Sequence, residues 1–148
     1  MSLETRIMGD LKEAMKAKDQ AALRSIRALK AAITLIKTDG SGTVMDEAAE
    51  MKLVQKQVKQ RQESLGIYEE QGREDLAVKE REEIEVLSRY LPEQMSDADL
   101  SAFIGDLIQK AGATSMKDMG KIMGMASGQL AGKADGKSIS AKVKALLS

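Results

Sequence analysis

Glycine and lysine recur together near the end of this 148-residue sequence, in a segment whose composition otherwise favours helix. Between residues 119 and 138 a glycine falls at every fourth position. These glycines are Gly120, Gly124, Gly128, Gly132 and Gly136. A glycine inside a helix costs about 1 kcal/mol relative to alanine, so a compensating use is expected. Exposed main chain beside ammonium groups suits non-covalent binding of an anionic backbone.

A helical wheel of residues 116–130 separates three of these glycines from the apolar side chains. The predicted core face consists of Met116, Met119, Met123, Ala126 and Leu130. Gly120, Gly124 and Gly128 lie off this face, and Lys117 and Lys121 fall in the same sector as the glycines. Two interpretations stay open: another helix packs closely on the glycines, or a phosphodiester backbone approaches them.

The turn "GKADGK" at residues 132–137 extends the basic character toward the predicted start of the last helix. A helix N-terminus binds anions through its free N–H groups. The predicted nucleic-acid-binding residues are Lys117, Gly120, Lys121, Gly124, Gly132, Lys133, Lys137 and Lys142. A secondary basic patch is predicted at Arg24, Arg27 and Lys30, although a solvated helix face is the simpler interpretation.

The absence of cysteine and histidine limits the chemistry that this sequence can perform. Histidine is the commonest general base and transition-metal ligand, so we expect no metal, no cofactor and no independent catalysis. Acidic residues crowd the stretch 69–85, but alternating charges of this kind are typical of a solvated helix face rather than a Mg²⁺ site. No apolar run approaches 18 residues and no signal peptide is evident, which predicts a cytoplasmic protein without membrane association.

Charge is distributed unevenly although the net charge is zero. Residues 1–45 carry a net charge of +3 and residues 112–148 a net charge of +4, whereas residues 46–92 and 93–111 are net negative. A polyanionic partner would therefore meet the two ends of the chain.

The spacing of apolar residues predicts an all-α protein. Helices are expected at about 3–17, 20–37, 46–71, 74–91, 97–110, 116–130 and 137–148, with a loop at 38–43. The third and fourth helices meet at Gly72, which indicates a long antiparallel hairpin. Arg61 falls within its apolar seam, where we expect it to pair with Glu80 or Glu83, because a lone buried charge is costly.

Pro92 predicts the boundary between two domains, because the residue before a proline avoids helical geometry. Residues 1–92 form the predicted N-terminal helical domain. Residues 93–148 form a predicted three-helix bundle, introduced by the capping pattern of Ser96 and Asp99.

Several longer motifs resemble the YqeY family and its GatB/YqeY domain. They are "LRSIRALKAAI" at 23–33, "KQRQESLGIYEEQGREDLAVKE" at 59–80, "YLPEQMS" at 90–96 and "KDMGKIMG" with "GKADGK" at 117–137. The residues that match the tail pattern shared with GatB are Gly120, Gly124, Gly132, Lys133 and Ala134. The family commonly has proline and lysine near 128 and 129, where this chain has Gly128 and Gln129.

The resemblance implies an accessory role in RNA metabolism. GatB is a subunit of the glutamine-dependent amidotransferase that acts on misacylated tRNA, and its tail is understood to contact tRNA. The implied partners are tRNA or another structured RNA, together with amidotransferase subunits or another protein. The carbon–nitrogen ligase activity, with glutamine as amide donor, describes the GatB complex, since the catalytic portion of GatB is absent here. The alternative is a helical protein-interaction module that docks a partner on its glycine face.

Overall fold

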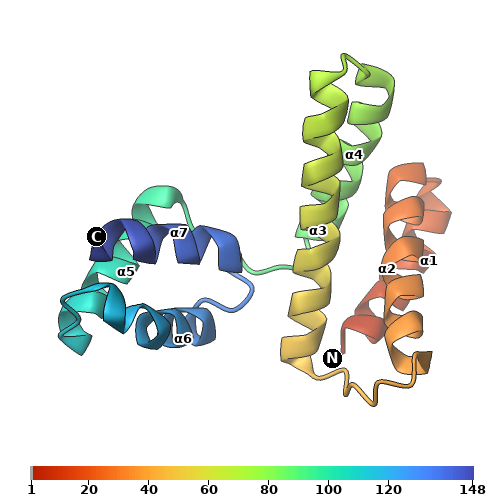
Figure 1. Cartoon of the computed structure of the whole chain (residues 1–148). Coiled ribbons are helices and arrows are strands. Elements are labelled where there is room, and N and C mark those ends of the chain that lie inside the picture. The colour runs from red at the N-terminus through yellow and green to blue at the C-terminus, as the bar shows by residue number, and fades with distance from the viewer. Residues whose placement is uncertain (1) are drawn as a thin grey trace. The chain divides into compact units, whose positions relative to one another are not determined.

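The computed structural model describes residues 2–148, which form α-helices joined by turns and loops and contain no β-strand (Figure 1). The all-α prediction is therefore confirmed. The helices are α1 (Leu3–Ala17), α2 (Gln20–Thr38), α3 (Glu47–Glu70), α4 (Glu74–Ser88), α5 (Asp97–Ala111), α6 (Met119–Gln129) and α7 (Gly136–Leu147). A single 3₁₀ turn, Met116–Asp118, precedes α6.

The helices group into two compact units, one that ends at Leu91 and one that spans Pro92–Ser148. Each unit has its own hydrophobic core, built from residues of that unit alone. The N-terminal core centres on the fully buried Ile7, Leu29, Ile33, Val54 and Leu87.

In the N-terminal unit, α1 packs on α2, and α2 packs in turn on α4. The turn between α1 and α2 is tight: Lys18 adopts a left-handed conformation, and the Asp19 carboxylate caps α2 by accepting the Ala22 N–H at 3.1 Å. The long α3 and α4 run antiparallel from the turn at Gly72, whose φ of 67° suits glycine (Figure 1).

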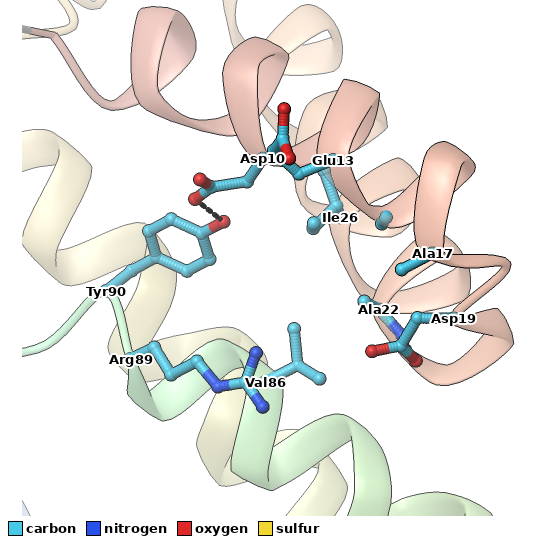
Figure 2. A pocket seen from close by; sticks show the side chains of 10 residues that line it. Asp10, Glu13, Ala17, Asp19, Ala22, Ile26, Val86, Arg89 and Tyr90 are labelled. Atoms are coloured by element: carbon cyan, nitrogen blue, oxygen red, sulfur yellow. Dashed lines mark hydrogen bonds between the residues drawn. The ribbon is translucent and has the colours of Figure 1, made fainter.

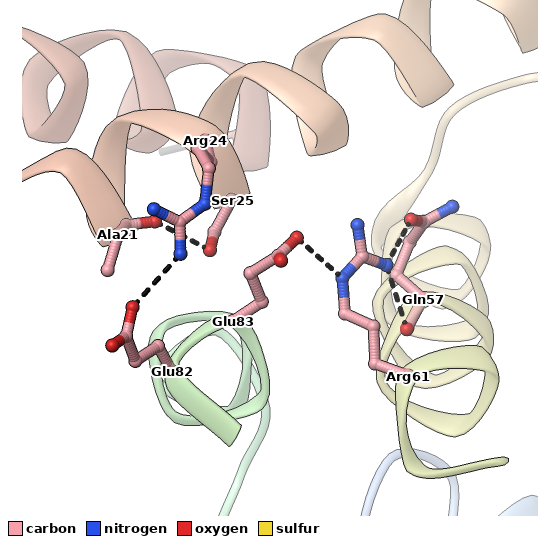
Figure 3. Close-up of polar contacts among 7 residues, drawn as sticks. All are labelled: Ala21, Arg24, Ser25, Gln57, Arg61, Glu82 and Glu83. Carbon is pink, nitrogen blue, oxygen red and sulfur yellow. Dashed lines mark hydrogen bonds and ion pairs between the residues drawn. The ribbon is translucent and has the colours of Figure 1, made fainter. Parts of the chain in front are cut away.

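A half-buried ion pair lies in the seam between α3 and α4 (Figure 3). Arg61 Nε lies 3.2 Å from Glu83 Oε1, and its Nη1 donates to the carbonyl and side-chain oxygens of Gln57. The prediction that Arg61 pairs within the seam is confirmed, with Glu83 as its partner. Glu80 lies nearby; burial and then the negative charge of Glu83 raise its pKa, and Arg61 partly opposes them.

In the C-terminal unit, α5, α6 and α7 pack around the buried side chains of Ile104, Ile122, Ile139 and Val143. The Ser96 hydroxyl caps α5 by accepting the Asp99 N–H at 3.1 Å, as its sequence pattern predicts. These three helices are the elements that position the predicted nucleic-acid-binding residues.

The core face of α6 differs from the predicted stripe. Ile122, which lies outside that stripe, is fully buried, whereas Met116 is 42% exposed. Met116 lies in the 3₁₀ turn, so the α-helical wheel does not apply to it. Met119 and Met123 pack at the edge of the core around Ile122, Ala126 and Leu130.

Candidate nucleic-acid interface

The glycines of α6 face outward and have no packing role inside their unit. Gly120, Gly124 and Gly128 are exposed, and a Cβ atom placed on any of them would meet no atom within 4 Å. Close packing of another helix of this unit on the glycines is therefore excluded. We call this surface, Gly120, Gly124 and Gly128 with the exposed Lys117 and Lys121, the α6 glycine face.

The two lysines of this face leave their positive charge available. Lys121 lies on α6, on the same side as the glycines, and Lys117 lies in the 3₁₀ turn just before the helix. Among the ion pairs between described residues, none involves Lys117 or Lys121. Asp118, which lies between them in sequence, directs its carboxylate to the Thr114 N–H at 3.1 Å.

The turn after α6 gives Gly132 a structural role rather than a surface role. Gly132 is buried and has a φ of 80°, a left-handed conformation that glycine adopts without strain. Its carbonyl oxygen accepts a hydrogen bond from Gln94 Nε2 at 2.7 Å, and the Lys133 carbonyl accepts the Met95 N–H at 3.0 Å. The predicted contact of Gly132 with a ligand is replaced by a contact with the segment before α5.

The start of α7 already carries a carboxylate. Asp135 is the N-cap residue and accepts the Ser138 N–H at 2.6 Å. An incoming phosphate would meet this negative charge, so the helix N-terminus itself does not offer a free anion site. Lys133 and Lys137 are exposed on either side of Asp135 and are the groups here that could reach a phosphate.

Lys142 differs from the other predicted binding lysines because its charge is already used in an ion pair. Its Nζ lies 2.9 Å from the Asp97 carboxylate at the start of α5, and its side chain is only 20% exposed. This lysine links α7 to α5. The sequence could not show the pairing, because Asp97 and Lys142 are 45 positions apart.

The secondary basic patch is divided by the fold. Arg24 donates to the Glu82 carboxylate at 3.0 Å and so joins α2 to α4 (Figure 3). Arg27 and Lys30 instead line a groove on α1 and α2. The three residues therefore do not act as one cationic surface.

Tyr90 lies between two hollows of the N-terminal unit, and the sequence did not indicate this arrangement. Its hydroxyl donates to Asp10 Oδ2 at 2.5 Å, and the Arg6 guanidinium lies 5.1 Å from its ring centroid. Burial, reinforced by the Asp10 carboxylate, raises the pKa of the Tyr90 hydroxyl. One hollow, of about 300 Å³, is lined by Asp10, Arg89 and Tyr90 among others (Figure 2).

The described part of the chain, residues 2–148, holds no cluster of three or more acidic side chains placed to bind a metal ion. Within the same residues, every helix is too short or too polar to cross a bilayer. The geometry thus describes a small helical protein with an open basic surface on its C-terminal unit.

The comparison with known proteins supplies the family. The model for YqeY-like proteins matches residues 4–147, and the chain belongs to the YqeY family. It is similar to "Altered inheritance of mitochondria protein 41, mitochondrial" from several fungi. The Vanderwaltozyma polyspora protein is 34% identical over 116 residues, 74% of this chain and 63% of the relative.

Two further fungal relatives carry the same name. The Lachancea thermotolerans protein is 34% identical over 115 residues, 74% of this chain and 62% of the relative. The Pyrenophora tritici-repentis protein is 28% identical over 142 residues, 94% of this chain and 77% of the relative. The chain thus spans slightly less than two thirds of the first two relatives. These relatives are named as mitochondrial proteins, and a cytoplasmic location for this chain stays a prediction.

Proposed function

We propose that this protein is a non-catalytic RNA-binding accessory protein that holds the backbone of a tRNA, or another structured RNA, against the α6 glycine face. The observation that carries the proposal is that this face is open. Three consecutive turns of α6 expose main chain, with two unpaired lysines beside it.

The energetic argument is that these glycines weaken α6 without improving the packing of its unit. Each costs up to about 1 kcal/mol relative to alanine. A ligand that contacts the main chain offsets this cost, because a Cβ atom would hold it away from the helix. Phosphate oxygens suit the surface, because they accept hydrogen bonds from lysine and are attracted by its charge.

The basic side chains available for phosphate contacts are fewer than the sequence suggested. Lys117 and Lys121 supply the central contacts, and Lys133 and Lys137 extend them, while Lys142 is held by Asp97. By resemblance to the GatB tail, the role of such a surface is to hold tRNA for an amidotransferase. On this proposal the ligase chemistry belongs to that partner enzyme.

The test is binding of the full chain to a fluorescently labelled tRNA at increasing salt concentration. Wild-type affinity should fall steeply, with a log–log slope of about −0.7 to −0.9 for each phosphate contact. The K117E/K121E variant should bind at least about tenfold more weakly, with a slope smaller in magnitude by about 2.

The matched control is K52E/K56E, which reverses two exposed lysines at the same spacing on α3. It makes the same change in net charge, so it should bind tRNA nearly as well as wild type. Equal losses in both variants would mean that only total charge matters. A tRNA affinity that changes neither with salt concentration nor in either variant would contradict the RNA proposal and favour docking of a protein on the glycine face.

A further inference from the structure

A shallow groove with a volume of about 520 Å³ runs along α2 and is bordered by Leu11 of α1; it belongs to the N-terminal unit and shares no residue with the α6 glycine face. Leu11 of α1 and Ala31 and Leu35 of α2 supply its apolar surface. Leu35, in the last turn of α2, is 66% exposed, a large fraction for a leucine within a helix. We call this feature the α1–α2 groove.

The threonine that lies between the apolar residues adds little polar character. The Thr34 hydroxyl donates to the Lys30 carbonyl oxygen at 3.0 Å, so its hydrogen-bonding proton is already used within α2. Met8 and Met15 are also exposed, at helical spacing from Leu11 on α1. Methionine and leucine side chains of this kind adapt readily to an apolar partner surface.

The charged residues of the groove are of one sign. Arg27 and Lys30 line it, and no carboxylate does. Neither residue takes part in an ion pair with a described residue. The other two basic residues of α2, Arg24 and Lys37, both pair with carboxylates from other helices.

We infer that the α1–α2 groove is a docking site for an acidic amphipathic helix of a partner protein. The groove residues of α2 extend from position 27 to 38, about 16 Å or three helical turns. A helix of three to four turns would place apolar side chains at i, i+4 and i+7 against Leu11, Ala31 and Leu35. Its flanking Asp or Glu side chains would then meet Arg27 and Lys30.

Charge complementarity decides between this occupant and others. A basic helix would be repelled by Arg27 and Lys30. RNA would gain two phosphate contacts with Arg27 and Lys30. However, the groove has no aromatic ring on which a base could stack, and bound RNA would leave the apolar surface exposed to solvent. An acidic amphipathic helix would bury the apolar surface and pair its carboxylates with the two cations.

The test is selection of 16-residue peptides from a random displayed library, with the full chain as target. Wild type should enrich peptides with Leu or Ile at helical spacing and Asp or Glu beside them. The charge-reversed variant R27E/K30E should enrich Lys or Arg at those flanking positions instead. A selected acidic peptide should bind R27E/K30E at least tenfold more weakly than wild type.

Two variants separate docking in the groove from loss of folding. L35D should abolish peptide binding without loss of helical circular dichroism, because Leu35 is largely exposed. V44D, at a 75% exposed valine in the loop after α2, is the matched control and should bind peptide as wild type does. tRNA binding should be unchanged in L35D and in R27E/K30E.

Three outcomes would overturn the inference. They are an absence of enriched acidic peptides, enrichment that does not depend on Leu35, and the same flanking charges selected by wild type and R27E/K30E. A loss of tRNA binding in R27E/K30E would also overturn it, and would assign the groove to RNA. Failure of the tRNA experiment on K117E/K121E would leave this inference intact, since the two surfaces share no residue.

Discussion

Tyr90 shows how a single side chain connects the ends of the N-terminal unit. It follows the last turn of α4, yet its hydroxyl reaches Asp10 in the middle of α1, 80 positions earlier in the sequence. Arg6, one turn before Asp10, covers the ring. Tyr90 belongs to the buried core of its unit, but the sequence could not identify Asp10 and Arg6 as its partners.

Replacement of Tyr90 by phenylalanine should reduce the free energy of unfolding by about 1.5–3 kcal/mol at pH 7, because one hydrogen bond to a carboxylate is lost. The pKa of Tyr90 is raised above its ordinary value of about 10 in the folded state. The associated stabilisation is therefore complete below pH 10 and is lost as the pH rises further. Urea unfolding at pH 7, 9 and 11 should show the difference between wild type and Y90F shrinking only at pH 11.

Tyr68 provides the control for this experiment. It is half-buried on α3, and its hydroxyl makes no hydrogen bond to a described residue. Y68F should therefore unfold nearly as wild type does at pH 7. A Y90F protein as stable as wild type at pH 7 would show that the Asp10 hydrogen bond contributes nothing.

At the level of residues, the sequence predicted exposure better than it predicted partners. The lysines at 117, 121, 133 and 137 are exposed, as a binding surface requires. Gly132 and Lys142 are not, because one forms a left-handed turn and the other pairs with Asp97. Both exceptions depend on contacts between distant segments, which periodicity does not encode.

At the level of elements, α6 combines a buried side and a bare side within eleven residues. The helix limits read from the sequence agree closely with the structure, since caps and glycines mark them locally. Ala126 and Leu130 of the predicted stripe are buried, whereas Met116 is not, because it lies in the 3₁₀ turn, where the rotation per residue differs from that of an α-helix.

The exposed glycines of α6 lead to a prediction in which stability and binding change in opposite directions. Gly124→Ala should raise the free energy of unfolding by about 0.5–1 kcal/mol, because alanine favours helix and the added methyl group meets no atom. The same methyl group should weaken tRNA binding by holding the phosphate backbone away from the helix. Circular dichroism during urea unfolding and fluorescence anisotropy with labelled tRNA measure the two effects.

Gly66→Ala is the matched substitution, since Gly66 is an exposed glycine inside α3 with the same open surroundings. It should raise stability by a similar amount and leave tRNA binding unchanged. If G124A binds tRNA as tightly as wild type, the main chain of α6 is not the contact surface.

At the level of the whole molecule, the two separate cores predict two separate folding units. The fragments 2–91 and 92–148 should each give a helical circular dichroism spectrum and a cooperative unfolding transition. The shorter fragment should be the less stable, because a domain of about 60 residues buries a smaller fraction of its surface. Overlay of amide NMR spectra of the fragments on that of the full chain provides the measurement. If the amide resonances of the fragment 92–148 fell within the narrow chemical-shift range of an unfolded chain, this prediction would be contradicted.

The Arg61–Glu83 pair limits which motions are available to the hairpin of α3 and α4. Long apolar seams repeat every seven residues, and helices that share such a repeat can slide past one another by one heptad without losing most apolar contacts. Such a slip here would leave a guanidinium and a carboxylate both half-buried and without each other, a state that costs several kcal/mol. The ion pair therefore favours the same alignment of the two helices that the tight turn at Gly72 imposes.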